Sequence, residues 1–259
     1  MKTYLKRHFA SIICGIIALV IMWAVWFIAC KSVKNEYVIP SVRQTFNALF
    51  TAFKEALFWR ALLRTLIKSL IGVSLSFILA GTIALPSKLF KGVDGVMRPI
   101  IAVIRTLPTM AVLVLLLLYT SRFTAPIIVA MLVLFPMIYA QFKSALDNID
   151  EQIIRTAKVF KLSKKQKVFK VYLPLVTPSL FSHAGSNISF AIKLVISAEV
   201  MIGAYTSIGG MIQYAGYEDL PRLFALTLFA VIIGIVIETT FHLLSKKLFK
   251  WTRAEGKND

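Results

Sequence analysis

Acidic residues are scarce in this sequence of 259 residues, in which 12 Asp and Glu stand against 30 Lys and Arg. Charged residues of both signs make up only 16% of the chain, whereas hydrophobic residues make up 58%. A soluble domain is about a quarter charged and about half apolar, so this composition argues against one. Together with a mean hydropathy of +0.77, it predicts an integral membrane protein.

Residues that carry chemistry are also few. The two cysteines, Cys14 and Cys30, lie too far apart along one apolar run to form a disulfide, and the three histidines form no cluster. No metal-ligand spacing and no convergent set of nucleophile and base is visible. The phosphate-binding pattern G-x-x-x-x-G-K-[ST] is missing as well. We therefore expect no catalytic residue, no metal and no cofactor bound by this chain, and no enzyme activity of its own.

Six apolar runs approach or exceed the roughly 20 residues that a helix needs to cross a bilayer. They are Phe9–Ala29, Leu62–Leu85, Ile100–Tyr119, Ala125–Phe142, Leu173–Ile202 and Leu223–Leu244. The fifth is too long for one straight crossing, so part of it must tilt, bend or lie outside the bilayer core. We expect an all-α, polytopic membrane protein with six transmembrane helices.

The positive charges indicate how these spans are oriented. With six spans both termini share one side, and the segments on that side hold 18 Lys and Arg, against 8 on the other side. Because basic residues favour the cytoplasmic side, we expect cytoplasmic N and C termini. This bias also explains the net charge of +18 without any nucleic-acid partner.

A predicted amphipathic helix separates the first two spans. Pro40-Ser41 could start it, and apolar residues from Val42 to Phe53 recur at helical spacing. It is expected at the outer membrane surface or against the helix bundle. We therefore divide the chain into residues 1–57 (first span and outer helix), 58–250 (transmembrane domain, with a cytoplasmic loop at about 148–172) and 251–259 (cytoplasmic tail).

The segment Asp150–Pro178 is a basic, amphipathic insert between the fourth and fifth spans. Its seven basic residues are Arg155, Lys158, Lys161, Lys164, Lys165, Lys167 and Lys170. Ser163 is a plausible N-cap for a second short helix beginning at Lys164. The pattern predicts two short helices that lie parallel to the membrane and dock on a partner. A loop held against anionic lipid headgroups fits the residues equally well.

The insert resembles the cytoplasmic loop of binding-protein-dependent ABC importer permeases, the type I transmembrane subunits. That family's signature is Glu-Ala-Ala, three residues, Gly, nine residues, then Ile-x-Leu-Pro. Aligned on Leu173-Pro174, Ala157 matches and Val171 is a mild change. The departures are Arg155, Thr156 and Lys161, which stand at the Glu, Ala and Gly positions. Since Gly is favoured where φ is positive, Lys161 makes this turn costly unless the loop geometry there differs.

Other stretches resemble the nitrate/sulfonate/taurine branch of these permeases. They are Phe58–Leu66, Arg105-Thr106-Leu107-Pro108 and Ser197-Ala198-Glu199-Val200. The resemblance, which covers about Val38 to Arg253, implies the type I ABC importer permease fold in a bacterial inner membrane. It also implies a second permease copy, an extracytoplasmic substrate-binding protein, and a separate ABC ATPase that binds the ATP.

In this family the loop docks on the ATPase as a coupling helix. The resemblance thus implies a coupling role for Arg155, Thr156, Ala157, Phe160, Lys161, Leu162, Leu173 and Pro174.

A stripe of polar residues marks the fifth span. Its members are Ser182, Ser186, Ser189, Lys193 and Ser197, whose spacing places them on one helix face. We expect Ser186, Ser189, Lys193 and Ser197 to face the translocation path or the partner permease, although serines at this spacing also serve helix packing. Glu199 is expected to be structural near an outer gate or to pair with an Arg on another span. The roles of Lys68, Arg105 and Glu238 stay open.

The alternative to an ATP-driven importer is a secondary transporter or channel that works without an ATPase. Such a protein would usually be longer and built from repeated halves, and no internal repeat is visible here. The branch allows nitrate, sulfonates, taurine, or small aromatic and vitamin-precursor molecules as the solute. Lys193 favours an anion among these.

Overall fold

The computed structural model describes residues 2–33 and 38–249, and every regular element in this part of the chain is helical. The first six helices are α1 (Lys2–Val33), α2 (Val42–Lys54), α3 (Ala56–Leu89), α4 (Lys91–Thr106), α5 (Thr109–Tyr119) and α6 (Thr124–Asp147). They are followed by α7 (Glu151–Val159), α8 (Lys164–Lys167), the π-helical turn η1 (Val168–Tyr172), α9 (Leu173–Ile202), α10 (Ile208–Glu218) and α11 (Leu220–Leu248). The expected all-α class is confirmed, and the expected tail 251–259 lies outside the described residues.

Four of the expected spans are single helices that are long and apolar enough to cross a membrane, namely those in α3, α6, α9 and α11. The expected first span falls within α1, whose described apolar part is Val20–Val33. The α9 span begins early, because α8 and η1 continue directly into it and make one helical stretch from Lys164 to Ile202.

The third expected span is not one straight helix. The chain bends by 91° between α4 and α5, so the two helices cross as a broken span or form a re-entrant loop. Leu107, with ψ of 126°, is extended where it precedes Pro108. A residue before proline is pushed out of the helical region, and proline itself offers no N–H. The expected span from Ile100 to Tyr119 is therefore interrupted at Leu107 and Pro108.

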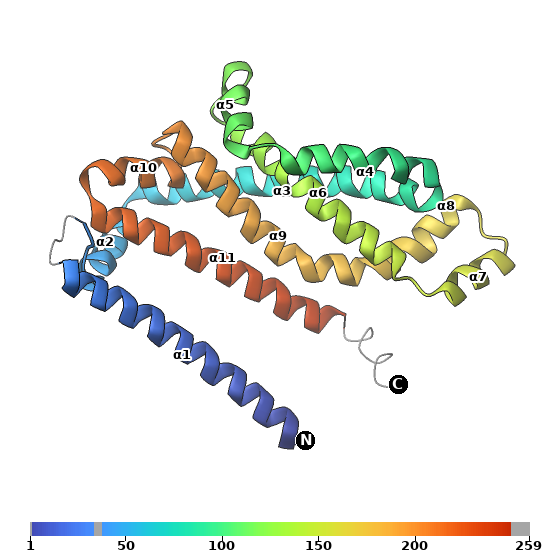
Figure 1. The fold of residues 1–259 in the computed structure, drawn as a ribbon, viewed down its shortest axis with the longest axis horizontal. Helices are drawn as coiled ribbons and strands as arrows, with labels where there is room; N and C mark the ends of the chain where they lie inside the picture. Colours follow the sequence, from blue (N-terminus) through green and yellow to red (C-terminus); the bar gives the residue numbers. More distant parts are fainter. Residues whose placement is uncertain (1, 34–37, 250–259) are drawn as a thin grey trace.

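The long helices α3, α6, α9 and α11 form the body of the molecule (Figure 1). One end of this bundle carries α2 and α10, and the opposite end carries α7. The start of α1 and the end of α11 point away from the α2 and α10 end. The largest buried cluster lies between α3, α6 and α9 and includes Leu134, Ile138 and Val176.

Helix α2 begins where the sequence predicted. The Ser41 side chain accepts a hydrogen bond from the Gln44 N–H, and the Gln44 side chain accepts one from the Ser41 N–H. In the second of these bonds the Ser41 N–H donates to Gln44 Oε1, and this capping box satisfies N–H groups that have no partner within the helix. Leu49 and Ala52 are buried while Phe50 is exposed, so the amphipathic helix packs against the bundle.

Candidate functional site

Helix α7 of the basic insert begins and ends with local hydrogen bonds. The Asp150 carboxylate accepts from the Gln152 N–H at 2.7 Å. At the other end the N–H of Leu162 donates to the Ala157 carbonyl at 3.2 Å, and that of Lys161 donates to Lys158 at 2.9 Å. These two bonds define a Schellman motif, which ends a helix through one left-handed residue.

That left-handed residue is Lys161, with φ of +50°. Of the two possibilities that the sequence left open, a costly turn or a different geometry, the structure has the costly turn, because the Lys161 backbone adopts the conformation that glycine would take most readily. A residue with a Cβ pays about 1–2 kcal/mol to adopt it. The hydrogen bonds of the motif and the burial of Ala157 hold the turn in place against this cost.

Ser163 starts the next helix, as its N-cap signal predicted. Its hydroxyl accepts from the Gln166 N–H, and the Gln166 side chain accepts from the Ser163 N–H. This helix is not a second separate piece, however. The i→i+5 bond from the Leu173 N–H to the Val168 carbonyl lets the helix continue past Pro174, which has no N–H to donate. The insert therefore holds one short helix and an extension of α9, instead of the two short helices expected.

The insert has an inner face and an exposed apolar face. Ala157 is buried, and Ile154 packs against the main core. Val159, Phe160 and Phe169 are 79%, 73% and 61% exposed, and we call these three residues the loop face. Several large apolar side chains exposed on one short insert favour a contact with a partner.

The other residues expected in the coupling loop lie around this face. Arg155 is exposed and pairs with Glu151 at 2.8 Å, and the Thr156 hydroxyl donates to the Gln152 carbonyl. Lys161 and Pro174 are exposed, whereas Leu162 and Leu173 are half-buried. The insert thus carries its polar residues on the outside and anchors through a few aliphatic ones.

Ionic contacts connect the helix ends beside the insert. Asp147 at the end of α6 accepts from Lys88 of α3 at 2.9 Å and lies 3.5 Å from Lys143 of α6. The Lys164 ammonium lies 4.5 Å from the centre of the Phe90 ring. These contacts tie α3, α6 and α8 together next to α7.

Three of the four expected path residues line one groove between α9 and α11. Ser189, Lys193 and Ser197 face it from α9, while Thr227 and Glu238 face it from α11. The volume of this α9–α11 groove is about 470 Å³. Ser186, the fourth expected residue, is not among its lining residues, and its hydroxyl donates to the His183 carbonyl.

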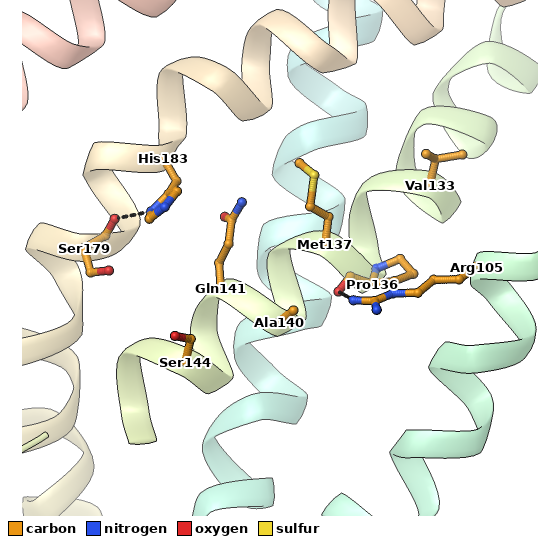
Figure 2. Close-up of a pocket in the computed structure, with 9 residues that line it drawn as sticks. All are labelled: Arg105, Val133, Pro136, Met137, Ala140, Gln141, Ser144, Ser179 and His183. Atoms are coloured by element: carbon orange, nitrogen blue, oxygen red, sulfur yellow. Dashed lines mark hydrogen bonds between the residues drawn. The ribbon is translucent and has the colours of Figure 1, made fainter. Parts of the chain in front are cut away.

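A second cleft lies on another side of α9, between α4, α6 and α9 (Figure 2). Its volume is about 500 Å³, and Arg105, Gln141 and His183 supply its large polar side chains. The Arg105 guanidinium donates to the Pro136 carbonyl at 3.3 Å, and the His183 Nδ1 lies 2.8 Å from the Ser179 carbonyl oxygen. Of these side chains, only Arg105 was singled out in the sequence, as a charge within a span.

A buried polar cluster joins α3, α9 and α10. The Lys68 ammonium lies 2.8 Å from Glu199 Oε1, with side chains 4% and 0% exposed. Glu199 Oε2 accepts from the Thr65 hydroxyl at 2.8 Å and from the Gly209 N–H at 3.3 Å, and Thr65 Oγ1 accepts from the Ile208 N–H at 3.2 Å. Glu199 therefore pairs with a lysine, not with the arginine that was one of the expected partners.

Gly209 permits the close approach that this cluster needs. A Cβ at this position would overlap the Ile196 carbonyl and the Glu199 side chain. Gly203, with φ of +66°, provides the left-handed residue that ends α9 and turns the chain toward α10.

Metal ligands do not come together in the part of the chain that the structure describes. No group of three His, Cys, Asp or Glu side chains there could hold a metal ion.

Comparisons with known proteins agree with this architecture. Residues 72–250 match the family model described as the binding-protein-dependent transport system inner membrane component. The chain is 24% identical over 255 residues to the taurine transport system permease protein TauC of Escherichia coli K12, covering 95% of this chain and 91% of the relative. It is also 24% identical over 245 residues to the putative aliphatic sulfonates transport permease protein SsuC of Bacillus subtilis 168, covering 92% and 87%.

Solved structures share the fold. A chain of a bacterial alginate ABC transporter, in complex with a periplasmic protein that holds an alginate pentasaccharide, superposes with a TM-score of 0.68 at 15% identity, covering 93% of this chain and 96% of that one. A chain of the methionine ABC transporter MetNI in an inward-facing conformation gives a TM-score of 0.60 at 18% identity, covering 74% and 95%.

These matches decide between the alternatives drawn from the sequence. The family model spans more than half of the chain, and the relatives are ABC permeases, not secondary transporters or channels. The two sulfonate-related relatives confirm the expected branch. The chain therefore belongs to the family of binding-protein-dependent transport system inner membrane components, and it is the permease subunit of an ABC importer in the nitrate/sulfonate/taurine branch.

Proposed function

We propose that this chain pairs with a second copy in a bacterial inner membrane, with both termini in the cytoplasm. A separate ABC ATPase binds and hydrolyses ATP, and an extracytoplasmic binding protein delivers a small solute. The family description, which names binding-protein-dependent transport and an inner membrane component, supports this arrangement. The absence of a phosphate-binding motif from the sequence supports a separate ATPase.

The observation that carries the proposal is the loop face. Its three large apolar side chains are exposed at the α7 end of the bundle, where the excess of basic residues predicts the cytoplasm. Removing apolar surface from water contributes about 25 cal/mol per Å², so docking of this face on a protein partner is favourable. In the proposed complex the loop face enters a groove of the ATPase, and Arg155, Thr156 and Lys161 border the contact.

The rest of the insert would transmit motion. Ala157 and Leu162 hold α7 through the Schellman turn, and α8 runs without a break into α9 through Leu173 and Pro174. A displacement of the docked loop would therefore act directly on α9. Since α9 carries the serine and lysine stripe, this continuous helix would link ATPase closure to the solute directly.

We assign the translocation path to the polar face of α9. Ser189, Lys193 and Ser197 line the α9–α11 groove, and Ser186 lies one turn further along the helix. An ammonium group within a membrane span is costly unless it meets water, a counter-charge or a solute. Lys193 and the taurine and sulfonate relatives together favour a small organic sulfonate or a related anion as the solute.

Truncation of Phe160 tests the proposal at its central contact. The tagged full-length chain would be purified from membranes of its native host, and ATP-binding subunits in the eluate would be quantified. Phe160→Ala should lower the recovered ATPase about tenfold or more, because a central aromatic anchor contributes about 2 kcal/mol or more to such an interface. Phe50→Ala is the matched control, since Phe50 is 61% exposed on α2 at the opposite end of the bundle.

Two results would count against this function. One is a wild-type chain that transports solute in vesicles while no ATPase is present. The other is a Phe160→Ala variant that retains its ATPase but loses binding to vesicles of anionic lipid, because the loop face would then be a lipid contact.

A further inference from the structure

The α9–α11 groove holds two opposite charges that do not pair. Lys193 lines it from α9 and Glu238 lines it from α11, and both residues are exposed. Among the described residues, neither side chain has a charged partner within 4.0 Å. Both lie within spans, where an isolated charge is expensive.

The packing of the two helices gives the spacing of these charges. Glu238 lies opposite Gly185, because a Cβ on Gly185 would come 3.1 Å from the Glu238 Cα. Gly234 in turn lies opposite Ser189, whose Oγ would be 2.8 Å from an added Cβ. The helices are therefore antiparallel, and Lys193 lies eight residues beyond the level of Glu238, or about 12 Å at 1.5 Å per residue.

The direction of the side chains shortens this separation. Side chains on an α-helix lean toward its N-terminus. On antiparallel helices, Lys193 therefore leans toward the level of Ser189, and Glu238 leans toward the level of Gly234. The two charged groups therefore lean toward the same level of the groove, and they stay more than 4.0 Å apart. Their separation along the helix axes lies below the roughly 12 Å between the levels of the two residues.

The surroundings of these two charges fit a small molecule. Ser197 and Thr227, which are exposed and carry hydroxyl groups, line the groove, while Val231 and Ile235 form an apolar wall. The groove volume of about 470 Å³ lies within the range of about 300–1,000 Å³ that is typical of small-molecule pockets.

We propose that the α9–α11 groove is a binding site for a small zwitterion, a molecule that carries an ammonium group and an anionic oxyacid group a few ångströms apart. The Lys193 ammonium binds the anionic group, and the Glu238 carboxylate binds the ammonium group by charge-assisted hydrogen bonds. A simple anion would repel the Glu238 carboxylate and leave it without a partner. A simple cation would repel the Lys193 ammonium and leave it without a partner. The inference rests on the proposed function and narrows its solute from an anion to a zwitterion.

Three probes of similar size distinguish the contributions of the Lys193 and Glu238 charges to binding. They are 2-aminoethanesulfonate (zwitterion), ethanesulfonate (anion) and ethanolamine (cation), each measured by equilibrium binding to the purified full-length chain. We expect the wild type to bind the zwitterion about tenfold or more tightly than either singly charged probe, a difference of about 1.4 kcal/mol. Equal affinity for all three, or no binding of the zwitterion, would overturn the proposal.

Single variants then assign each charge. Lys193→Met should reduce the affinity for the zwitterion and the anion about tenfold and leave the affinity for the cation unchanged. Glu238→Gln should reduce the affinity for the zwitterion and the cation about tenfold and leave the affinity for the anion unchanged. Lys246→Met, an exposed lysine near the end of α11, is the control and should change nothing. An equal loss for all three probes in both variants would mean a structural role and would contradict the assignment.

A charge exchange guards against misfolding of the single variants. Lys193→Glu combined with Glu238→Lys restores one charge of each sign and should bring zwitterion binding back to within about threefold of wild type. If the exchanged variant does not regain zwitterion binding, the proposal is overturned. It is also overturned if Lys193→Met dissociates the permease dimer while probe binding stays unchanged. If the chain co-purifies with an ATPase but does not prefer the zwitterion, only this inference is contradicted. If the chain prefers the zwitterion but no ATPase co-purifies with it, only the proposed function is contradicted.

Discussion

Two lysine–glutamate combinations lie inside the membrane helices, and only one of them is an ion pair. Lys68 and Glu199 touch at 2.8 Å and are almost fully buried, and a hydroxyl and a backbone N–H complete the bonding of the carboxylate. Lys193 and Glu238 face a groove, remain exposed and do not touch. The same two residue types thus pair with each other where they are buried, and stay available to a ligand where they face a groove.

Removal of one charge should separate the two combinations most clearly. Glu199→Gln leaves Lys68 buried without a counter-charge and should reduce the free energy of unfolding by about 3–5 kcal/mol. Glu238→Gln, the same change at an exposed position, should stay within about 0.5 kcal/mol of wild type. Chemical unfolding of the full chain in detergent measures both, and similar values would remove the distinction drawn here.

Removal of the second charge from the buried pair should reverse most of that loss. In the double variant Lys68→Met with Glu199→Gln no charge remains buried, and the glutamine can still accept from Thr65 and Gly209. We expect the free energy of unfolding of the double variant to exceed that of Glu199→Gln alone by about 2 kcal/mol or more in the same measurement. A double variant as unstable as the single one would show that packing, not charge, determines the effect.

The hydroxyl groups near each combination offer a smaller contrast. Thr65→Ala leaves the buried N–H of Ile208 without its acceptor and should cost about 1–3 kcal/mol of unfolding free energy. Thr227→Ala in the groove should cost within about 0.5 kcal/mol, because its hydroxyl is exposed and bonds only within its own helix. Hydrogen exchange at the Ile208 amide reports the same change locally, and unaltered protection there would contradict it.

The smallest expected effect extends the comparison from charge to backbone, at another lysine. Lys161→Gly should stabilise the last turn of α7 by about 1 kcal/mol, because glycine adopts positive φ without the Cβ clash. Lys158→Gly, three residues earlier within the helix, should destabilise it by about the same amount. Hydrogen exchange at the Lys161 and Leu162 amides should become slower in Lys161→Gly and faster in Lys158→Gly. A change of the exchange rate in the same direction in both variants would contradict this expectation.

Several features followed from local sequence alone. The Ser41 and Ser163 caps are local, since each side chain bonds a backbone group three residues away. The extent of α3, α6, α9 and α11 follows from apolar composition, because a helix satisfies its own backbone in a bilayer. Other features depended on distant residues and were missed or left open. Thr65 and Glu199 are 134 positions apart, so no local pattern could assign the partners of Glu199.

The sequence by itself determined the class of this protein, its membrane helices, its permease family and the existence of a basic insert between two spans. These depend on composition, periodicity and short motifs, which act over a few turns of helix. Only the tertiary structure decided that the chain bends by 91° before α5, that Lys161 is left-handed, and that Lys68 is paired while Lys193 is not. Whether a charge meets a counter-charge depends on which helices pack together and at what register, and that packing is a property of the whole fold.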